Sequence, residues 1–223
     1  MVYEPNLAID LLCTHNVITR SLEVAAEHCG QSLRSGELDE ASKDGFIDYL
    51  ECIRTVLTTH HHLETQKVFP YFQNKIPELP VKQLNQEHGK IGIHLIKFDD
   101  IIPDLKGDSL IPSLEQLNEA LTGINHVWYP HKELEEKYFT VEKIGNLLDK
   151  DEMRGQSEIY REFIIERYQP DYLVMPFQFY NLPPKERDIW AQKFPEIFTH
   201  KLISTEWKDK WSNMAEFFYP DVE

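Results

Sequence analysis

The chain has 223 residues, enough for one domain of ordinary size, or one domain with a substantial extension, and for a sizeable buried core. Its 23 basic and 38 acidic residues give a net charge of −15, which argues against a nucleic-acid surface and against binding to an anionic membrane. No stretch approaches the roughly 20 consecutive apolar residues of a membrane-spanning helix, and the N-terminus lacks the basic region of a secretory signal. We therefore expect a cytoplasmic protein whose three cysteines are free thiols.

Glycine is scarce, with 9 residues, and no alternating strand pattern persists, so the sequence predicts an all-α fold. A first helix is expected over residues 5–30, where apolar residues recur at helical spacing, followed by a polar loop over 31–40. A second helix is expected over 41–68, closed by Phe69 and Pro70.

Two further long helices are expected over residues 81–102 and from about 109 to 138. Four long amphipathic helices with short connections predict an up-down-up-down four-helix bundle at residues 1–148. The remainder, 149–223, is predicted to be a helical, aromatic-rich C-terminal extension that packs on the bundle and contains a helix over 183–201.

The pattern His-x-x-x-Glu occurs twice, at His60–Glu64 and at His131–Glu135. Residues four apart project from one face of a helix, and His15 and His88 also fall within apolar stripes of the predicted helices. Polar groups in a core are costly unless they are paired or coordinated, so a metal centre best satisfies all six. The predicted metal ligands are His15, His60, Glu64, His88, His131 and Glu135.

The other histidines are expected outside this ligand set. His61 and His62 lie roughly 100° and 200° around the helix from His60. Surface or outer positions are predicted for the whole remaining group: His28, His61, His62, His94, His126 and His200.

Six ligands exceed the four that one tetrahedral zinc ion uses. They suit two metal ions that share bridging carboxylates, with two imidazoles for each ion and open positions for a small exogenous ligand. Iron fits the mixed nitrogen and oxygen donors best, although manganese or zinc also fits the spacing.

In this order the residues resemble a hemerythrin-like (HHE cation-binding) domain. The resemblance covers roughly residues 7–145 and involves all four predicted helices. It rests on His15, on His60-x-x-x-Glu64 followed by VFP at 68–70, on Glu87-His88, and on His131-x-x-x-Glu135-Glu136. Membership implies a four-helix bundle that holds two iron ions (Fe2+ or Fe3+) in a non-haem di-iron centre.

The chain departs from that pattern in the third helix. Hemerythrin oxygen carriers have a second histidine one turn after the third-helix histidine, where this chain has Gly92. A four-His/two-Glu site is closer to the hemerythrin-like proteins that handle nitric oxide, oxygen or iron status. The segment 170–187 resembles the C-terminal extension of fungal hemerythrin-like proteins, which has no recognised chemistry.

These features favour a non-haem di-iron protein that binds or reacts with O2, NO or peroxide. The alternative is an enzyme, a di-iron oxygenase (an oxidoreductase), acting on a small organic substrate in a pocket partly formed by the extension. A third class is iron storage, or a site that governs folding. A closed, dry bundle would favour the first, and a cavity opening from the metals toward residues 170–218 would favour the oxygenase. Hydrolase and nucleotide-binding motifs are missing from the sequence.

Overall fold

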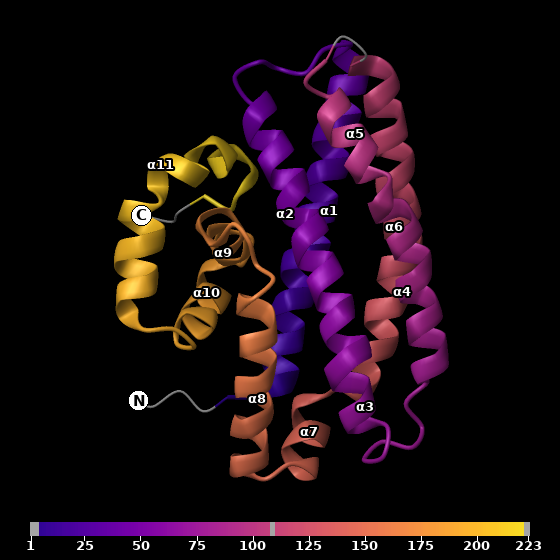
Figure 1. The fold of residues 1–223 in the computed structure, drawn as a ribbon, viewed down its shortest axis with the longest axis vertical. Helices are drawn as coiled ribbons and strands as arrows, with labels where there is room; N and C mark the ends of the chain where they lie inside the picture. Colours follow the sequence, from indigo (N-terminus) through magenta and orange to yellow (C-terminus); the bar gives the residue numbers. More distant parts are fainter. Residues whose placement is uncertain (1–4, 108–109, 221–223) are drawn as a thin grey trace.

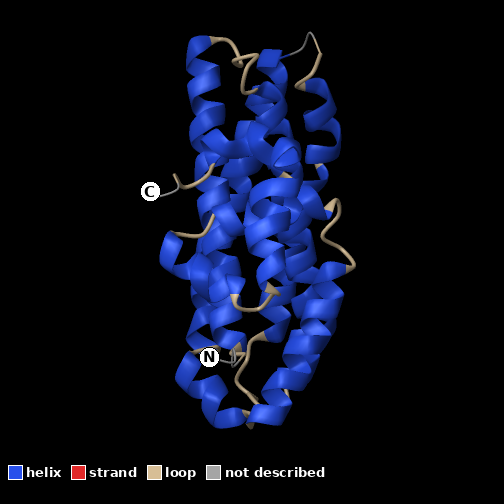
Figure 2. Cartoon of the chain, turned by 90° about the vertical axis from the view of Figure 1, so that its left-hand side faces the viewer, coloured by secondary structure: helices blue, strands red, loops and turns tan. Residues whose placement is uncertain are grey.

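The computed structural model describes residues 5–107 and 110–220. Helices joined by turns and loops make up this part of the chain, and it contains no strand (Figure 2), so the all-α prediction is confirmed. None of its helices is long and apolar enough to cross a membrane.

Four long helices lie side by side along the long axis of the molecule (Figure 1). They are α1 (Leu7–Ser35), α2 (Lys43–Leu63), α4 (Val81–Ile96) and α6 (Leu110–Tyr138). Successive members run in opposite directions, and α6 packs against both α1 and α4, while α2 packs against α1 and α4. Their inward faces are fully buried, with Leu22, Phe46, Leu50, Leu57, Leu117, Leu121, Ile124 and Trp128 at most 1% exposed. This core holds the four helices together at the positions that the apolar stripes predict.

The first helix is longer than predicted. α1 continues through Gly30 to Ser35, so the first half of the expected loop over 31–40 is helical. The helix ends at Gly36, whose φ of 79° is the left-handed conformation that glycine adopts readily. The Gly36 N–H donates to the Ser32 carbonyl at 2.9 Å, which closes the last turn.

The second helix also continues beyond its predicted end. α2 passes into the π-helical turn η1 (Glu64–Val68) and then into α3 (Phe69–Phe72). Pro70 does not close the helix, because it lies in the first turn of α3, where its missing N–H is tolerated. The π-helical turn, a feature often found at functional sites, begins at Glu64.

The helix predicted over 81–102 is two helices. α4 ends at Ile96, and α5 (Phe98–Asp104) follows after Lys97 and packs against α2 and α6. Phe98, Ile101 and Ile102 are buried there, so core contacts decide the change of direction.

Beyond Tyr138 the chain forms short helices. α7 (Val141–Leu147) precedes α8 (Lys150–Ile165), which begins with a capping box formed by Asp149 and Glu152. The predicted boundary between residues 148 and 149 falls at this turn. α9 (Asp171–Tyr180) then follows within the aromatic segment.

The prediction of one continuous helix over 183–201 was wrong. α10 (Pro184–Ala191) ends before Pro195, and the π-helical segment η2 (Phe198–Glu206) begins after it. Proline has no N–H to donate and restricts the residue before it, so it separates the two helices. α11 (Lys208–Trp211) and the 3-10 helix η3 (Ser212–Phe217) complete the described chain.

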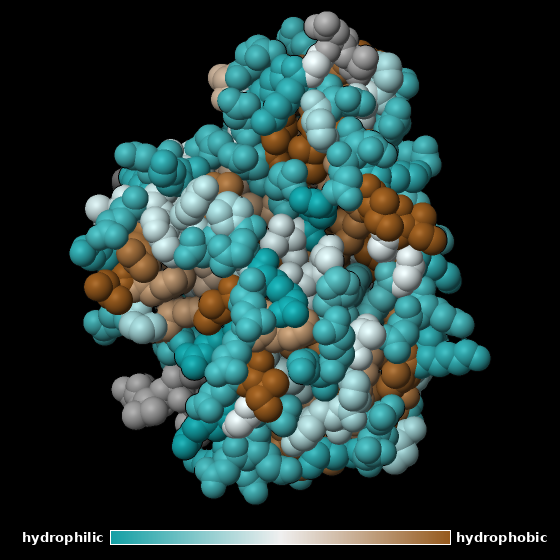
Figure 3. All heavy atoms as spheres, in the orientation of Figure 1, coloured by the Kyte–Doolittle hydropathy of each residue, from teal (hydrophilic) through white to brown (hydrophobic). Residues whose placement is uncertain are grey.

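The C-terminal helices pack on α1 and α2 and share a hydrophobic core with them (Figure 1). The Tyr49 ring lies 4.9 Å from Phe177 and 5.2 Å from Phe217. At Gly45 the approach is so close that an added Cβ would overlap the carbonyl group of Asn213. Figure 3 shows a mainly hydrophilic face with scattered apolar side chains. The three cysteines, Cys13, Cys29 and Cys52, are free and buried.

Candidate metal centre

Seven His and Glu side chains meet between the four long helices. All six predicted ligands are among them, and none is more than 8% exposed. His15 comes from α1, His88 from α4, and His131 and Glu135 from α6. The stretch from α2 to η1 supplies the remaining three: His60, His61 and Glu64.

Nine atoms of these side chains are buried without a hydrogen-bond partner in the described chain. They are the Nε2 atoms of His15, His60, His61, His88 and His131, and both carboxylate oxygens of Glu64 and of Glu135. Buried polar atoms in proteins are nearly always hydrogen-bonded, and each exception requires an explanation. Five lone-pair nitrogens and four carboxylate oxygens in one place are the donor atoms of a metal site.

The imidazoles fall into two groups. His15 and His60, the two-histidine group, have donor atoms within 4.8 Å of each other and of donor atoms of Glu64 and Glu135. His61, His88 and His131 form the three-histidine group, whose donor atoms also lie within 4.8 Å of one another. Glu64 and Glu135 further form a set with His88 and His131.

Each carboxylate therefore lies between the two groups. The oxygens of Glu64 are 3.3 Å from His60 Nε2 and 3.3 Å from His88 Nε2. Oε2 of Glu135 is 3.3 Å from His15 Nε2 and 3.5 Å from His131 Nε2. Two ligands about 2.1 Å from one ion, at angles between 90° and tetrahedral, are about 3.0–3.4 Å apart. The observed separations are close to that range, so each carboxylate could hold a metal ion together with an imidazole of either group.

His61 is the residue that the sequence analysis missed. It is 5% exposed, and its ring stacks on His88 with centroids 4.1 Å apart. His61 thus brings a fifth imidazole to the cluster, from the second helix. The signal was present as the tract 60–62 together with the missing histidine at position 92.

Two of the imidazoles, those of His15 and His131, are held by a carboxylate at their other ring nitrogen. Nδ1 of His15 lies 2.9 Å from Glu136, and Nδ1 of His131 lies 2.9 Å from Glu87. A carboxylate at Nδ1 keeps the proton there, which leaves the Nε2 lone pair for a metal. The same contact with His15 lowers the pKa of Glu136.

Burial controls the charge of the site. It lowers the pKa of His60 and of His61 well below the usual range and that of His88 to about 3. At His15 burial also opposes protonation, but Glu135 and Glu136 outweigh it and the pKa is raised. Burial and the neighbouring Glu135 raise the pKa of Glu64 well above its usual range. The lowered pKa values keep His60, His61 and His88 neutral, and neutral imidazoles beside crowded carboxylates suit a cation.

Aromatic rings enclose the centre. Trp128 packs edge-on against His15 at 5.2 Å, and its indole N–H donates to Thr19 at 3.0 Å. The ring of Phe69 stacks on His88 at 5.5 Å. These contacts restrict the orientations of the imidazole rings and keep water away from the parts of the centre that Trp128 and Phe69 cover.

The other five histidines lie outside the cluster, although His28 and His94 are partly buried rather than at the surface. His62, His126 and His200 are exposed. His28 is partly buried against Phe46, with ring centroids 4.4 Å apart.

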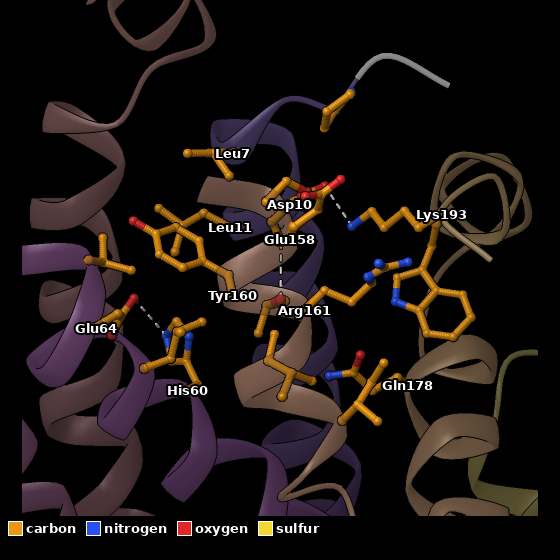
Figure 4. Close-up of a pocket in the computed structure, with 18 of the residues that line it drawn as sticks. Leu7, Asp10, Leu11, His60, Glu64, Glu158, Tyr160, Arg161, Gln178 and Lys193 are labelled. Carbon is orange, nitrogen blue, oxygen red and sulfur yellow. Dashed lines mark hydrogen bonds and ion pairs between the residues drawn. The ribbon is translucent and has the colours of Figure 1, made fainter. Parts of the chain in front are cut away.

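A cavity of about 320 Å³ adjoins the centre (Figure 4). His60 and Glu64 line it, together with residues of α1, α8, α9 and α10. None of the three-histidine group lines it. The cavity therefore reaches the centre from the side of the two-histidine group.

Comparison of the chain with protein-family models, with curated proteins and with solved structures finds no match.

Proposed function

We propose that the chain is a hemerythrin-like, non-haem di-iron protein that binds or reacts with O2, NO or peroxide. The observation that carries this proposal is the set of nine buried, unpartnered donor atoms, arranged as two imidazole groups around two common carboxylates. In this proposal the four long helices α1, α2, α4 and α6 form the up-down-up-down bundle of that family.

The ligand set in this proposal is five His and two Glu rather than four His and two Glu. His15 and His60 would hold one ion, and the three-histidine group, with His61 included, would hold the other. Glu64 and Glu135 would bridge them. The mixed nitrogen and oxygen donors favour iron, while manganese or zinc are the competing occupants.

Bound iron would supply reversible redox chemistry and a coordination position for a diatomic ligand or peroxide. The chain's own residues present imidazole Nε2 atoms, hold protons on Nδ1 through Glu87 and Glu136, and exclude water with Trp128 and Phe69. The two-histidine group offers one imidazole fewer. Its side of the centre is therefore the one left more open to an exogenous ligand, and it is the side that the cavity reaches.

The cavity favours a second candidate, an oxidoreductase that uses O2 on a small organic substrate. Its volume of about 320 Å³ exceeds what a diatomic ligand needs and falls within the range of small-molecule sites. Residues of the C-terminal helices, such as Met175 and Trp190, form part of its wall, as the oxygenase alternative requires.

Optical spectroscopy of the iron-loaded protein tests the proposal. The protein is reduced without oxygen and then exposed separately to O2 and to NO. New absorption bands that need both iron and the added gas are expected, and they should be lost in Glu135→Ala. An iron-loaded protein whose spectrum responds to neither gas would refute the proposed function.

A further inference from the structure

The cavity beside the centre opens to solvent among charged side chains. Arg154, Glu158 and Arg161 of α8 are exposed and line it, as does the partly buried Lys193, which pairs with Asp10 at 2.6 Å. These five residues form the mouth of the cavity. They comprise three cations and two carboxylates, so the mouth is net positive in a chain whose net charge is −15.

Two of those cations are available to a ligand. Within the described part of the chain, neither Arg154 nor Arg161 forms a hydrogen bond or ion pair. Figure 4 shows Arg161 and Lys193 on the opposite side of the cavity from His60 and Glu64. A guanidinium group there suits a carboxylate, which it can bind through two parallel hydrogen bonds.

Most of the wall between the mouth and the centre is apolar, although Thr14, Tyr168 and Gln178 also line it. It includes Leu11, Leu63, Phe72, Ile164, Met175 and Trp190. A volume of about 320 Å³ holds about ten non-hydrogen atoms, at about 30 Å³ for each water-sized group. The wall therefore suits a saturated carbon chain rather than a sugar or a nucleotide.

One polar atom of the wall lies near the centre without a partner among the described residues. The hydroxyl group of Tyr160 is buried without a hydrogen-bond partner in the described chain. Tyr160 lies on the same side of the cavity as His60 and Glu64 (Figure 4). An unpartnered buried hydroxyl that lines a cavity is available to an oxygen atom at the inner end of a bound molecule.

We propose that this cavity binds a medium-chain organic acid, with its carboxylate at Arg161 and its chain directed toward His60, Glu64 and Tyr160. The inference rests on the proposed function in its oxidoreductase form, since it names the class of organic substrate that would reach the centre. Octanoate, with ten non-hydrogen atoms, is the probe that matches the volume.

Calorimetric titration of the purified full-length protein tests the proposal. Octanoate should bind more tightly than 1-octanol or octylamine. The substitution Arg161→Gln should lower the affinity for octanoate at least about tenfold. Arg54→Gln, which removes the same charge from a half-buried residue of α2 that does not line the cavity, should leave the affinity unchanged. Equal affinity for octanoate and 1-octanol, or no effect of Arg161→Gln, would overturn the proposal.

A second titration tests whether the end of the ligand far from its carboxylate lies at Tyr160. We expect 8-hydroxyoctanoate to bind about three- to tenfold more tightly than octanoate, and this gain should vanish in Tyr160→Phe. A gain that survives in Tyr160→Phe would contradict the orientation. Metal content is measured on the same samples. Iron without octanoate binding refutes only this inference, whereas octanoate binding without iron refutes only the di-iron function.

Discussion

Replacing His61 by leucine is expected to act in opposite directions on the metal-free and the iron-loaded protein. His61 is 5% exposed, and its Nε2 atom has no hydrogen-bond partner in the described chain. Leucine occupies the site without placing a polar atom in the core. Without metal the substitution removes a desolvation cost, whereas with metal it removes a ligand.

The two effects are of similar size. An unpaired buried polar group costs about 1–3 kcal/mol, and the ring contact with His88 returns about 0.5–1.5 kcal/mol of that. His61→Leu should therefore raise the free energy of unfolding of the metal-free protein by about 1 kcal/mol. Changes to residues that only support a ligand weaken metal binding about 10–100-fold, which is about 1.4–2.7 kcal/mol. Loss of a direct ligand should cost at least that much in the loaded protein.

Denaturant unfolding of chelator-treated and iron-loaded samples measures both effects, and elemental analysis gives the iron retained after dialysis. His62→Leu is the matched control, because His62 is the adjacent residue and is exposed. It should change neither stability nor iron content. If His61→Leu destabilises the metal-free protein by more than about 2 kcal/mol, or retains two iron ions, the assignment of His61 as a ligand is refuted.

Three further predictions concern positions around the centre and away from it. Glu136→Gln removes the charge that faces His15 Nδ1 and should weaken iron binding about 10–100-fold in chelator competition, whereas Glu133→Gln, exposed on the same helix, should not. Gly45→Ala forces a Cβ against the Asn213 carbonyl and should lower the free energy of unfolding by about 1–3 kcal/mol while iron content stays the same. Gly155→Ala, with open space around its Cβ, should not lower the free energy of unfolding, and denaturant unfolding measures both variants. Burial lowers the pKa of His28 despite the opposing charge of Asp39, so the unfolded chain takes up that proton first as the pH falls below about 6.5. Stability should therefore fall more steeply between pH 7 and 5 in the parent than in His28→Phe, and equal slopes would contradict this.

The long helices and the six predicted ligands follow from periodicity alone. A side chain on the apolar stripe of an amphipathic helix points into the core, so His15 and His88 were predictable without knowledge of their partners. His61 was not, because an apolar stripe predicts one inward face of a helix, and His61 lies about 100° around the helix from His60. With two groups of donors in the centre, His60 and the adjacent His61 each face one group.

Helix ends and the cavity were harder to predict, because they depend on contacts between distant residues. Gly30 and Pro70 are residue types that commonly mark the end of a helix, but here core packing outweighs that tendency and the helix continues. The capping box at Asp149 was a readable local signal for α8. By contrast, the pairing of Asp10 with Lys193 across the mouth of the cavity has no local pattern in the sequence.

The iron content of the purified protein tests the central claim most directly. Elemental analysis of protein produced with iron in the medium should give two iron ions per chain. Glu135→Ala, which removes a carboxylate common to both groups, should lose both ions, and His126→Ala, exposed on the same helix, should keep them. A chain that binds no metal, or a single tightly held zinc ion, would contradict a two-iron centre.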